Sequence, residues 1–467
     1  MITLSPTLFK AYDIRGIVGQ TLDASIAYDI GRAFGAAVLA QGEHAAIVGR
    51  DGRLSGPELS TALVNGLQST GVTVIDLGVV TTPMVYYATN VLSTTSGIMV
   101  TGSHNPADHN GFKMVLGGEA IYGDTIQLLY QAICDQAIVK STAQPKEPEE
   151  PGQYRPHDIK DYYLKRITSN VKLQRPMKIA IDCGNGVAGA FAAELYRAMG
   201  CEVIELFCEV DGRFPNHHPD PADPKNLQDL IRCLSETDAE IGLAFDGDGD
   251  RLGVVTKDGQ IIYPDRQLML FAKDVLTRHP GTEILYDVKC TRHLAPWIIE
   301  HGGKPLMCKT GHSLVKAKMR ETRAPLGGEM SGHVFFKDRW YGFDDGMYAG
   351  ARLLELLSNE TDPSAILNGL PQSISTPELH IKLNEGESVP LIAHLLSHAT
   401  FPGAVEVIKI DGLRVEYPDG FGLARASNTT SVIVMRFEAE SVEALGRIQN
   451  AFKRVILDAR PDAVLPY

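Results

Sequence analysis

The sequence lacks the features of a secreted, zinc-binding or membrane protein. Its seven cysteines are odd in number, and no two of them have the C-x-x-C spacing, so neither a disulfide framework nor a zinc site is indicated. No apolar run approaches the roughly 20 residues that a membrane span needs. The N-terminus also lacks a basic region followed by an apolar one. We therefore expect a cytoplasmic protein that does not engage a membrane.

Positive charge is also scarce. The chain has 44 Lys and Arg residues against 57 Asp and Glu residues, which gives a formal net charge of −13. Nucleic acids and anionic membranes bind to clustered Lys and Arg side chains that replace counterions. This balance argues against both kinds of partner, and an anionic small molecule would need a local basic pocket.

The chain does contain enough apolar residues for several cores. At 467 residues and 44% hydrophobic content, about 150 residues per domain suggest roughly three domains. One pattern recurs: an apolar strand, a polar turn with Asp, an amphipathic helix, a glycine and a second strand. The paired strands lie at 45–48 and 72–75, at 179–181 and 201–204, and at 283–286 and 305–307. Such units are typical of α/β domains, although any α/β protein yields some look-alikes by chance.

Proline-rich and polar segments mark the expected domain boundaries. One lies in the segment 140–156, a second near Gly259 and a third at 371–377. After the third boundary the pattern does not recur. Strand-like runs at 413–417 and 431–437, followed by a helix through Leu445 and Ile448, predict a small α+β domain instead. The predicted domains are residues 1–150, 151–259, 260–371 and 372–467.

A loop serine is the first candidate for chemistry. Ser103 lies in Thr101-Gly102-Ser103-His104-Asn105-Pro106, directly after the apolar run 97–100. Serine becomes a useful nucleophile when a base and a charge-stabilising group attend it. Here His104 is adjacent, and Lys113 follows in Asn110-Gly111-Phe112-Lys113. Read alone, a loop serine is most often a turn residue.

An acidic loop supplies the second signal. Asp246, Asp248 and Asp250 alternate with glycine and precede Arg251, directly after the apolar run 241–245. Three closely spaced carboxylates suit a hard cation such as Mg²⁺, which prefers oxygen ligands. A calcium loop is excluded because its sixth position, here Arg251, needs glycine, and its twelfth, Lys257, needs glutamate. A serine together with such a site indicates phosphoryl transfer.

Alternatives to a serine nucleophile stay open on the residues alone. A phosphatase could use Asp246 as its own phosphoryl acceptor, with Asp344 and Asp345 completing the site. A sugar-phosphate sensor would bind without turnover. The pair His217-His218 could suggest a metal, but its loop is proline-rich and offers no further ligand, so we interpret both histidines as structural.

Two further loops have the composition of ligand-binding loops. Glu329, Ser331 and His333 combine a carboxylate, a hydroxyl and an imidazole on a glycine-hinged turn, a mixture suited to sugar hydroxyls. The segment 425–430, Arg-Ala-Ser-Asn-Thr-Thr, offers a guanidinium and successive polar groups for a phosphate. Each loop taken singly could equally be a turn or a helix cap.

Taken in order, these four loops resemble the signature loops of the α-D-phosphohexomutase superfamily, and the resemblance spans essentially the whole chain. Met330 favours the hexose branch, because the glucosamine branch usually has glutamine there, and the resemblance is greatest to bacterial enzymes that act on both mannose and glucose phosphates. The implied fold has four domains around a central cleft. The first three share an α/β core, and the fourth is α+β.

The resemblance implies a reaction and a cofactor. Ser103 would carry a phosphate, pass it to O6 of a hexose 1-phosphate, and recover the other phosphate after the hexose 1,6-bisphosphate has turned round. One Mg²⁺ per chain would be bound by Asp246, Asp248, Asp250 and the phosphate on Ser103. Glucose or mannose 1,6-bisphosphate would be both intermediate and activator. We expect no partner other than sugar phosphates, and a monomer.

The resemblance also implies a role for each matching residue. Lys113 and His333 would be general acid and base, Arg251 would neutralise the transferring phosphoryl group, and Arg15 and His104 would contact the phosphoserine. Glu329 and Ser331 would bind O3 and O4, which glucose and mannose share. The remaining substrate contacts would come from Tyr12, Arg266, Lys289, His312, Arg425, Ser427, Asn428 and Thr429.

Overall fold

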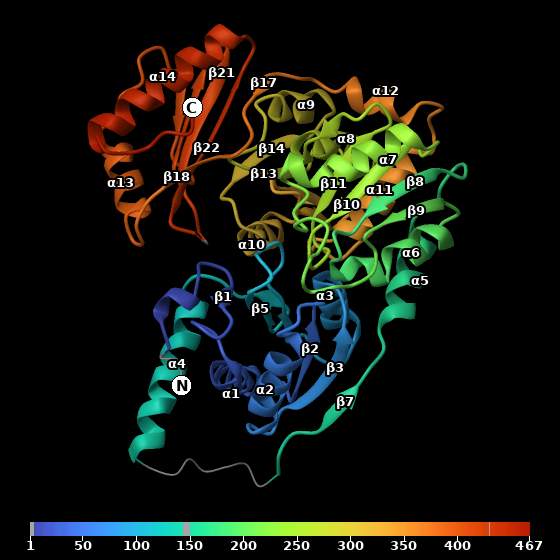
Figure 1. The fold of residues 1–467 in the computed structure, drawn as a ribbon, viewed down its shortest axis with the longest axis vertical. Coiled ribbons are helices and arrows are strands. Elements are labelled where there is room, and N and C mark those ends of the chain that lie inside the picture. Colours follow the sequence, from blue (N-terminus) through green and yellow to red (C-terminus); the bar gives the residue numbers. More distant parts are fainter. Residues whose placement is uncertain (1–3, 143–149, 429) are drawn as a thin grey trace. The chain divides into compact units, whose positions relative to one another are not determined.

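The computed structural model describes residues 4–142, 150–428 and 430–467 (Figure 1). The chain divides into two compact units. The first comprises Met1–Gln267 and Ser331–Gly369, and the second comprises Leu268–Met330 and Leu370–Tyr467. No helix within the described ranges is long and apolar enough to cross a membrane.

The N-terminal sheet of the first unit has the strand order β1-β5-β4-β2-β3-β7. Its strands are β1 (Ile14–Ile17), β2 (Ala45–Arg50), β3 (Thr73–Val79), β4 (Gly97–Val100), β5 (His109–Leu116) and β7 (Tyr154–Pro156), and the short β6 (Glu119–Ala120) pairs with β5. The predicted strands at 45–48 and 72–75 fall in β2 and β3, which pair in parallel across helix α2 (Gly56–Gln68). Since β2 also pairs in parallel with β4, the segments that follow β2 and β4 emerge at the same sheet edge.

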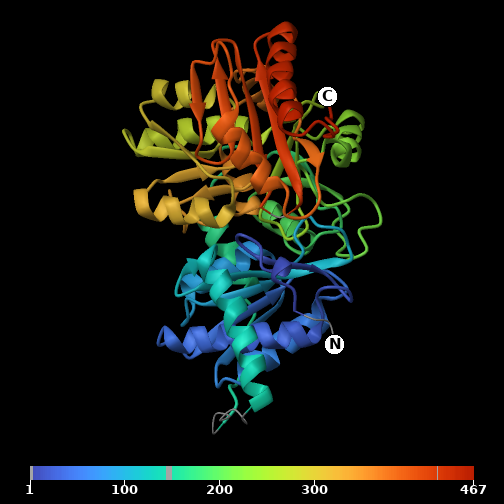
Figure 2. The ribbon, with the colours of Figure 1, turned by 90° about the vertical axis from the view of Figure 1, so that its left-hand side faces the viewer.

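Helices cover this sheet, and their apolar residues join its core. Helices α1 (Ala24–Ala40), α2 and α4 (Asp124–Thr142) lie over one face (Figures 1 and 2), where Ile30, Leu63, Val100 and Ile126 belong to one buried cluster. The shorter elements of this region are the 3₁₀ turn η1 (Pro6–Leu8) and helix α3 (Thr82–Val91).

A second sheet in the first unit has the order β12-β11-β10-β8-β9. Its strands are β8 (Lys178–Asp182), β9 (Glu202–Leu206), β10 (Ile241–Phe245), β11 (Leu252–Thr256) and β12 (Ile261–Ile262). The parallel pair β8 and β9 confirms the second predicted strand–helix–strand copy. Strands β10 and β11 are antiparallel, so the acidic loop is the hairpin turn between them. The remaining elements are α5 (Lys160–Asn170), η2 (Val187–Ala190), α6 (Ala192–Ala198), η3 (Pro224–Leu227), α7 (Gln228–Glu236), β16 (Val334–Phe336), α11 (Gly346–Leu357) and α12 (Pro363–Asn368).

The second unit contains the third copy and the C-terminal sheet. Strands β13 (Glu283–Asp287) and β14 (Lys304–Cys308) pair in parallel across α9 (Leu294–Glu300), as predicted, and β13 also pairs in parallel with β15 (Leu326–Gly328). Helix α10 (His312–Thr322) follows β14, and α8 (Pro264–Arg278) contains the division between the units.

The C-terminal sheet is antiparallel, with the order β17-β22-β21-β20-β19 and β18 beside β22. Its elements are β17 (Ile374–Ser375), β18 (Leu379–Lys382), α13 (Ser388–His398), β19 (Glu406–Ile408), β20 (Leu413–Tyr417), β21 (Gly420–Ala426), β22 (Val432–Ala439) and α14 (Val442–Ala459). The predicted strands at 413–417 and 431–437 and the helix through Leu445 and Ile448 are confirmed as β20, β22 and α14.

Helices α1 and α2 approach so closely that glycine is required at their contact. A Cβ atom at Gly66 would lie 2.1 Å from the carbonyl oxygen of Tyr28, and one at Gly31 would lie 2.3 Å from that of Leu63. Both neighbours are backbone atoms, which cannot yield as a flexible side chain does. The helix pair therefore depends on these two residues.

We predict that Gly66→Ala lowers the free energy of unfolding of the first unit by at least about 2 kcal/mol through overpacking. Gly446→Ala is the matched control, because its Cβ would enter open space in α14 and alanine should stabilise that helix by about 1 kcal/mol. Trp340 lies in the first unit and Trp297 in the second, so urea unfolding of single-tryptophan variants can follow each unit. Equal stability of Gly66→Ala and its parent would contradict the prediction.

Candidate active site

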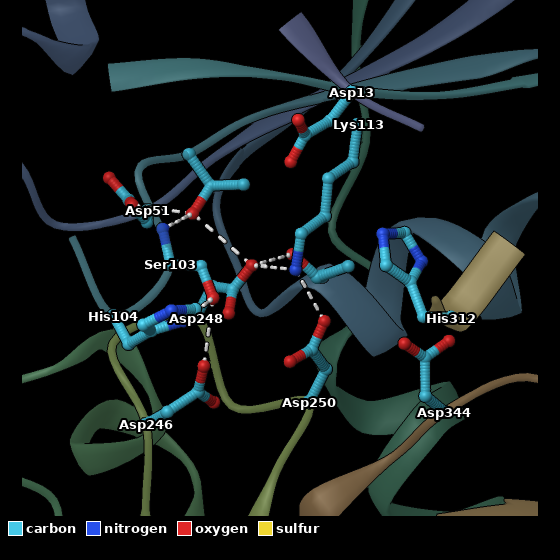
Figure 3. Close-up of polar contacts among 12 residues, drawn as sticks. Asp13, Asp51, Ser103, His104, Lys113, Asp246, Asp248, Asp250, His312 and Asp344 are labelled. Atoms are coloured by element: carbon cyan, nitrogen blue, oxygen red, sulfur yellow. Dashed lines mark hydrogen bonds and ion pairs between the residues drawn. The ribbon is translucent and has the colours of Figure 1, made fainter. Parts of the chain in front are cut away.

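The serine loop places a buried hydroxyl beside the acidic loop. Ser103 is fully buried and has a φ of 48°, a left-handed conformation that is rare for serine and costs energy. Its Oγ donates to Asp246 Oδ2 at 2.9 Å and lies 3.3 Å from Nδ1 of His104 (Figure 3). The predicted nucleophile and the predicted metal loop are therefore in direct contact.

Glycines in the acidic loop allow this contact. A Cβ at Gly247 would lie 2.3 Å from the carbonyl oxygen of Ser103, and Gly249 has a φ of 77°. The hairpin turn between β10 and β11 can thus press against the serine loop while its three aspartates turn inward. Asp246, Asp248 and Asp250 are each fully buried, and one carboxylate oxygen from each lies within 4.8 Å of the others.

Lys113 compensates part of this buried negative charge. Its Nζ on β5 donates to Oδ2 of Asp248 at 2.8 Å and to Oδ2 of Asp250 at 2.5 Å (Figure 3). Burial lowers the pKa of Lys113, but the two carboxylates raise it more, so the net pKa lies above its usual value. The ammonium group is therefore charged at neutral pH and can donate a proton or a hydrogen bond.

The three carboxyl groups respond differently to burial. Although burial raises each pKa, Lys113 brings the pKa of Asp248 below its usual value, and Lys113 with His333 brings that of Asp250 well below. For Asp246 the balance is reversed, because burial and the charges of Asp248 and Asp250 raise its pKa well above the usual range. Further positive charge is needed to keep all three ionised.

The residues present fit a metal ion. Oδ1 of Asp248 is buried and accepts no hydrogen bond from the described part of the chain, and a cation is the partner that a buried carboxylate oxygen requires. The donor set consists of carboxylate oxygens, as hard cations prefer. The group Asp246, Asp248 and Asp250 can therefore hold a metal ion.

His333 and Arg251 lie on the other side of the aspartates. Nε2 of His333 lies 3.2 Å from Asp250 Oδ1 and 3.9 Å from Asp344 Oδ2, and its Nδ1 lies 3.1 Å from Ser331 Oγ. Arg251 Nε lies 3.3 Å from Nε2 of His333 and 3.9 Å from Asp246 Oδ2. The structure thus brings His333, Ser331 and Arg251 together with the acidic loop.

The predicted partners of the serine loop differ in their placement. Arg15 donates to Asp13 at 2.7 Å and to the carbonyl of Gly102 at 3.2 Å, so it contacts the loop as expected. Tyr12 lies one residue before Asp13 and is partly buried. Arg266, in contrast, donates to the carbonyl of Leu367 at 3.3 Å, which is not one of the residues around the acidic loop. Its role in a substrate site stays a prediction.

The pKa of His104 is also displaced. Burial, and then the positive charges of Arg251 and Arg15, hold the pKa of this imidazole well below its usual range. His104 is therefore neutral at neutral pH. Because the one proton of the Ser103 hydroxyl goes to Asp246 Oδ2, the 3.3 Å contact suits the tautomer in which Nδ1–H of His104 donates to Ser103 Oγ.

The second unit gathers the other predicted ligand residues. Arg425 donates to Asp411 at 2.9 Å, and Lys289 donates to Glu378 at 2.5 Å. Thr310 links the two pairs. Its backbone N–H donates to Asp411 at 3.0 Å, and its hydroxyl donates at 3.0 Å to Asp287, which lies 3.9 Å from Lys289 Nζ. The cations expected to bind phosphate are therefore each held by a carboxylate.

Further contacts in this unit complete the group. Glu329 Oε1 accepts from the backbone N–H of Gly311 at 2.5 Å, and Asn428 Nδ2 donates to the carbonyl of Thr310 at 3.3 Å. Nδ1 of His312 lies 3.2 Å from Lys316 Nζ, and Ser427 Oγ accepts from the N–H of Thr430 at 3.2 Å. Thr429, also expected here, lies outside the described residues.

Sequence reasoning missed several residues of the site. Asp51 and Arg53 contact the serine loop, and Thr82 donates to Asp248 at 2.6 Å. Asp344, considered from the sequence only for the phosphatase alternative, lies 3.9 Å from His333. A signal for Asp51 existed, because it directly follows the first strand of the first repeat, β2, at the sheet edge from which the serine loop also emerges. The other contacts bridge long stretches of chain and had no local pattern.

Comparison with known families gives one consistent match. A family model described as phosphoglucomutase/phosphomannomutase, alpha/beta/alpha domain I, matches residues 6–137. The models of domain II, domain III and the C-terminal domain match residues 161–259, 263–374 and 378–455. These matches confirm the expected four-domain α/β architecture.

Individual relatives agree with the family models. A phosphoglucomutase of Neisseria gonorrhoeae is 58% identical over 467 residues and covers 100% of both chains. A phosphomannomutase/phosphoglucomutase of Pseudomonas aeruginosa is 52% identical over 100% of this chain and 98% of its own. The crystal structure of a phosphoglucomutase/phosphomannomutase family protein from Burkholderia thailandensis is 62% identical, with a TM-score of 0.93 over 100% of both chains.

The acidic group leads to a prediction about metal binding. Asp246→Asn should weaken the affinity for Mg²⁺ or Mn²⁺ by at least about tenfold, because it removes one of three charged oxygen ligands. Asp345→Asn is the control. Asp345 is also a buried carboxylate, but it lies outside the three-aspartate group and accepts a hydrogen bond from Tyr163 at 2.9 Å. Isothermal titration calorimetry measures both, and equal affinity of Asp246→Asn and the parent protein would exclude this metal site.

Proposed function

The chain belongs to the phosphoglucomutase/phosphomannomutase family, and we propose that it reversibly interconverts the 1-phosphates and 6-phosphates of glucose and mannose. The observation that carries this proposal is the buried Ser103 hydroxyl, 2.9 Å from a carboxylate of a three-aspartate group. A nucleophile and a metal group in contact are what phosphoryl transfer requires.

Ser103 is the proposed phosphoryl carrier. Its phosphate passes to O6 of a hexose 1-phosphate, which gives a hexose 1,6-bisphosphate and a free serine hydroxyl. The bisphosphate turns round and returns its C1 phosphate to Ser103, and the hexose 6-phosphate leaves. The net reaction consumes no phosphate, so glucose or mannose 1,6-bisphosphate is both intermediate and activator.

Charge neutralisation is assigned to the residues around the aspartates. When bound to Asp246, Asp248 and Asp250, a Mg²⁺ ion would withdraw charge from the transferring phosphoryl group. Arg251, 3.9 Å from Asp246, adds a guanidinium to the same region. Arg15 contacts the serine loop and His104 is part of it. Both side chains can donate hydrogen bonds to the phosphate oxygens of the phosphoserine.

Proton transfer is assigned to His333 and Lys113. Lys113 is kept protonated by two carboxylates, which suits a general acid. His333 has a buried carboxylate at 3.2 Å and suits the base that receives the proton of the attacking sugar hydroxyl.

Substrate recognition is assigned to the remaining loops. Lys289, His312, Arg425, Ser427 and Asn428 would bind the phosphate that is not being transferred, with Tyr12, Arg266 and Thr429 as further contacts. Glu329 and Ser331 would bind O3 and O4. Glucose and mannose share these hydroxyls and differ at C2, so this arrangement accepts both sugars.

Other expectations from the sequence remain part of this proposal. They are one Mg²⁺ per chain, a monomer in the cytoplasm, and domain boundaries at 150/151, 259/260 and 371/372. Size-exclusion chromatography with light scattering tests the monomer, and metal analysis of the dialysed protein tests the stoichiometry.

We predict that ³¹P NMR of mannose 1-phosphate and of glucose 1-phosphate shows conversion to the 6-phosphate, given Mg²⁺ and a trace of hexose 1,6-bisphosphate. Ser103→Ala should abolish detectable conversion and remove the acid-stable protein phosphate. Release of inorganic phosphate with an acid-labile label would instead favour a phosphatase that uses Asp246. Binding without turnover would favour a sensor.

We further predict that His333→Asn lowers kcat by about 10²- to 10⁴-fold, the usual contribution of a general base. The KM for hexose 1-phosphate should change far less, because the base acts in the transition state. His301→Asn is the control, since His301 lies on the second unit and bonds to the carbonyl of Trp297. A His333→Asn variant with the kcat of the parent would exclude His333 as the base.

A further inference from the structure

Arg53 lies at the centre of the serine loop. It follows β2, and its side chain is 1% exposed. Each terminal nitrogen donates to two backbone carbonyls of the loop, which for Arg53 extends from Thr101 to His109, the first residue of β5. Nη1 donates to Pro106 at 2.5 Å and His109 at 2.9 Å, and Nη2 donates to Ser103 at 2.7 Å and Asn105 at 2.6 Å. The guanidinium therefore joins four backbone carbonyls of this segment, in addition to backbone bonds such as the one from Asn105 N–H to the carbonyl of Gly102.

The surroundings of Arg53 are shaped to hold the guanidinium. A Cβ at Gly102 would lie 2.4 Å from its Cζ, so glycine at this position leaves room for it. The ring of Phe214 lies 5.1 Å from Cζ, in the proline-rich segment that also contains His217 and His218. A buried cation requires compensating partners. Here backbone carbonyls accept from both terminal nitrogens, and the carboxylate of Asp51 lies 3.3 Å from Nε.

Asp51 fixes Arg53 relative to the start of the loop. Its Oδ1 accepts from the backbone N–H of Arg53 at 3.0 Å, and its Oδ2 lies 3.3 Å from Arg53 Nε. Oδ2 also accepts from Thr101 Oγ1 at 2.7 Å and from the N–H of Gly102 at 3.2 Å. The ends of the parallel strands β2 and β4 are thereby tied together.

We infer that Arg53 is a positioning residue for phosphoryl transfer, because its bonds to the four loop carbonyls hold Ser103 in the left-handed conformation that directs Oγ at Asp246. The inference deepens the proposed function and rests on it. Arg53 acts on the reaction through the loop backbone, including the Ser103 carbonyl that abuts Gly247. Lysine cannot replace it, since it carries three donors on a single nitrogen and lacks the planar fork.

The test is the Arg53→Lys variant in the hexose 1-phosphate assay. We expect kcat to fall by about ten- to a hundredfold, because a misplacement of about 1 Å at a reacting atom has an effect of this size. The KM should change by less than about threefold, since Arg53 binds the loop and not the substrate. The ³¹P resonance of the Ser103 phosphate should also shift, which a loss of stability alone would not produce.

Arg352→Lys is the matched control. Arg352 is equally buried, donates to Asp338 at 3.0 Å and lies 4.6 Å from the ring of Phe336, and it contacts none of the loop carbonyls bound by Arg53. The Arg352→Lys variant should unfold at a lower temperature than the parent protein, while its kcat per folded molecule and its phosphoserine ³¹P resonance should stay unchanged. If Arg53→Lys does not fold, Gly102→Ala provides the second test, because its Cβ displaces the guanidinium and should cause the same loss of kcat.

The outcomes separate the two proposals. A wild-type protein that fails to interconvert the sugar phosphates overturns the proposed function. An active wild type whose Arg53→Lys or Gly102→Ala variant retains kcat and the ³¹P resonance overturns the role of Arg53. A loss of kcat in Arg352→Lys as large as in Arg53→Lys would also overturn it, because a general effect of losing a buried arginine would then suffice.

Discussion

The constraint on which the site depends is the mutual repulsion of three buried aspartates within 4.8 Å of one another. Such a group is stable only if positive charge surrounds it. Lys113 supplies part of that charge from β5, and Arg251 supplies more from the end of the same hairpin turn. The raised pKa of Asp246 shows that these cations leave a deficit. A divalent cation, and in its presence a phosphoryl group, is what the arrangement accommodates.

The same electrostatics distinguish the two candidates for proton transfer. Lys113 cannot serve as a resting base, because releasing its proton would leave Asp248 and Asp250 uncompensated. His333 lies 3.2 Å from Asp250. In the proposed reaction, Lys113 therefore compensates the charge of the aspartates and His333 accepts the proton. This division of roles would account for a lysine and a histidine next to the same carboxylate.

The parts predicted from the sequence are those with local patterns. Strands β2, β8 and β13 and their parallel partners follow from apolar runs, and Ser103 and Asp246 follow from their position directly after a strand. The role of Arg53 depends on contacts with residues about 50 positions along the chain, which no local period reveals.

In the proposed function, a chain of net charge −13 binds a dianion through its second unit, and the ion pairs of that unit limit how tightly the dianion is held. Arg425 and Lys289 are each paired with a carboxylate, Asp411 and Glu378. A phosphate that binds there must compete with these carboxylates, so the gain in Coulomb energy is smaller than for two unpaired cations. In the proposed reaction the bisphosphate has to leave this group, turn round and bind again. Moderate affinity therefore favours turnover, because a tighter phosphate site would hold the intermediate in one orientation.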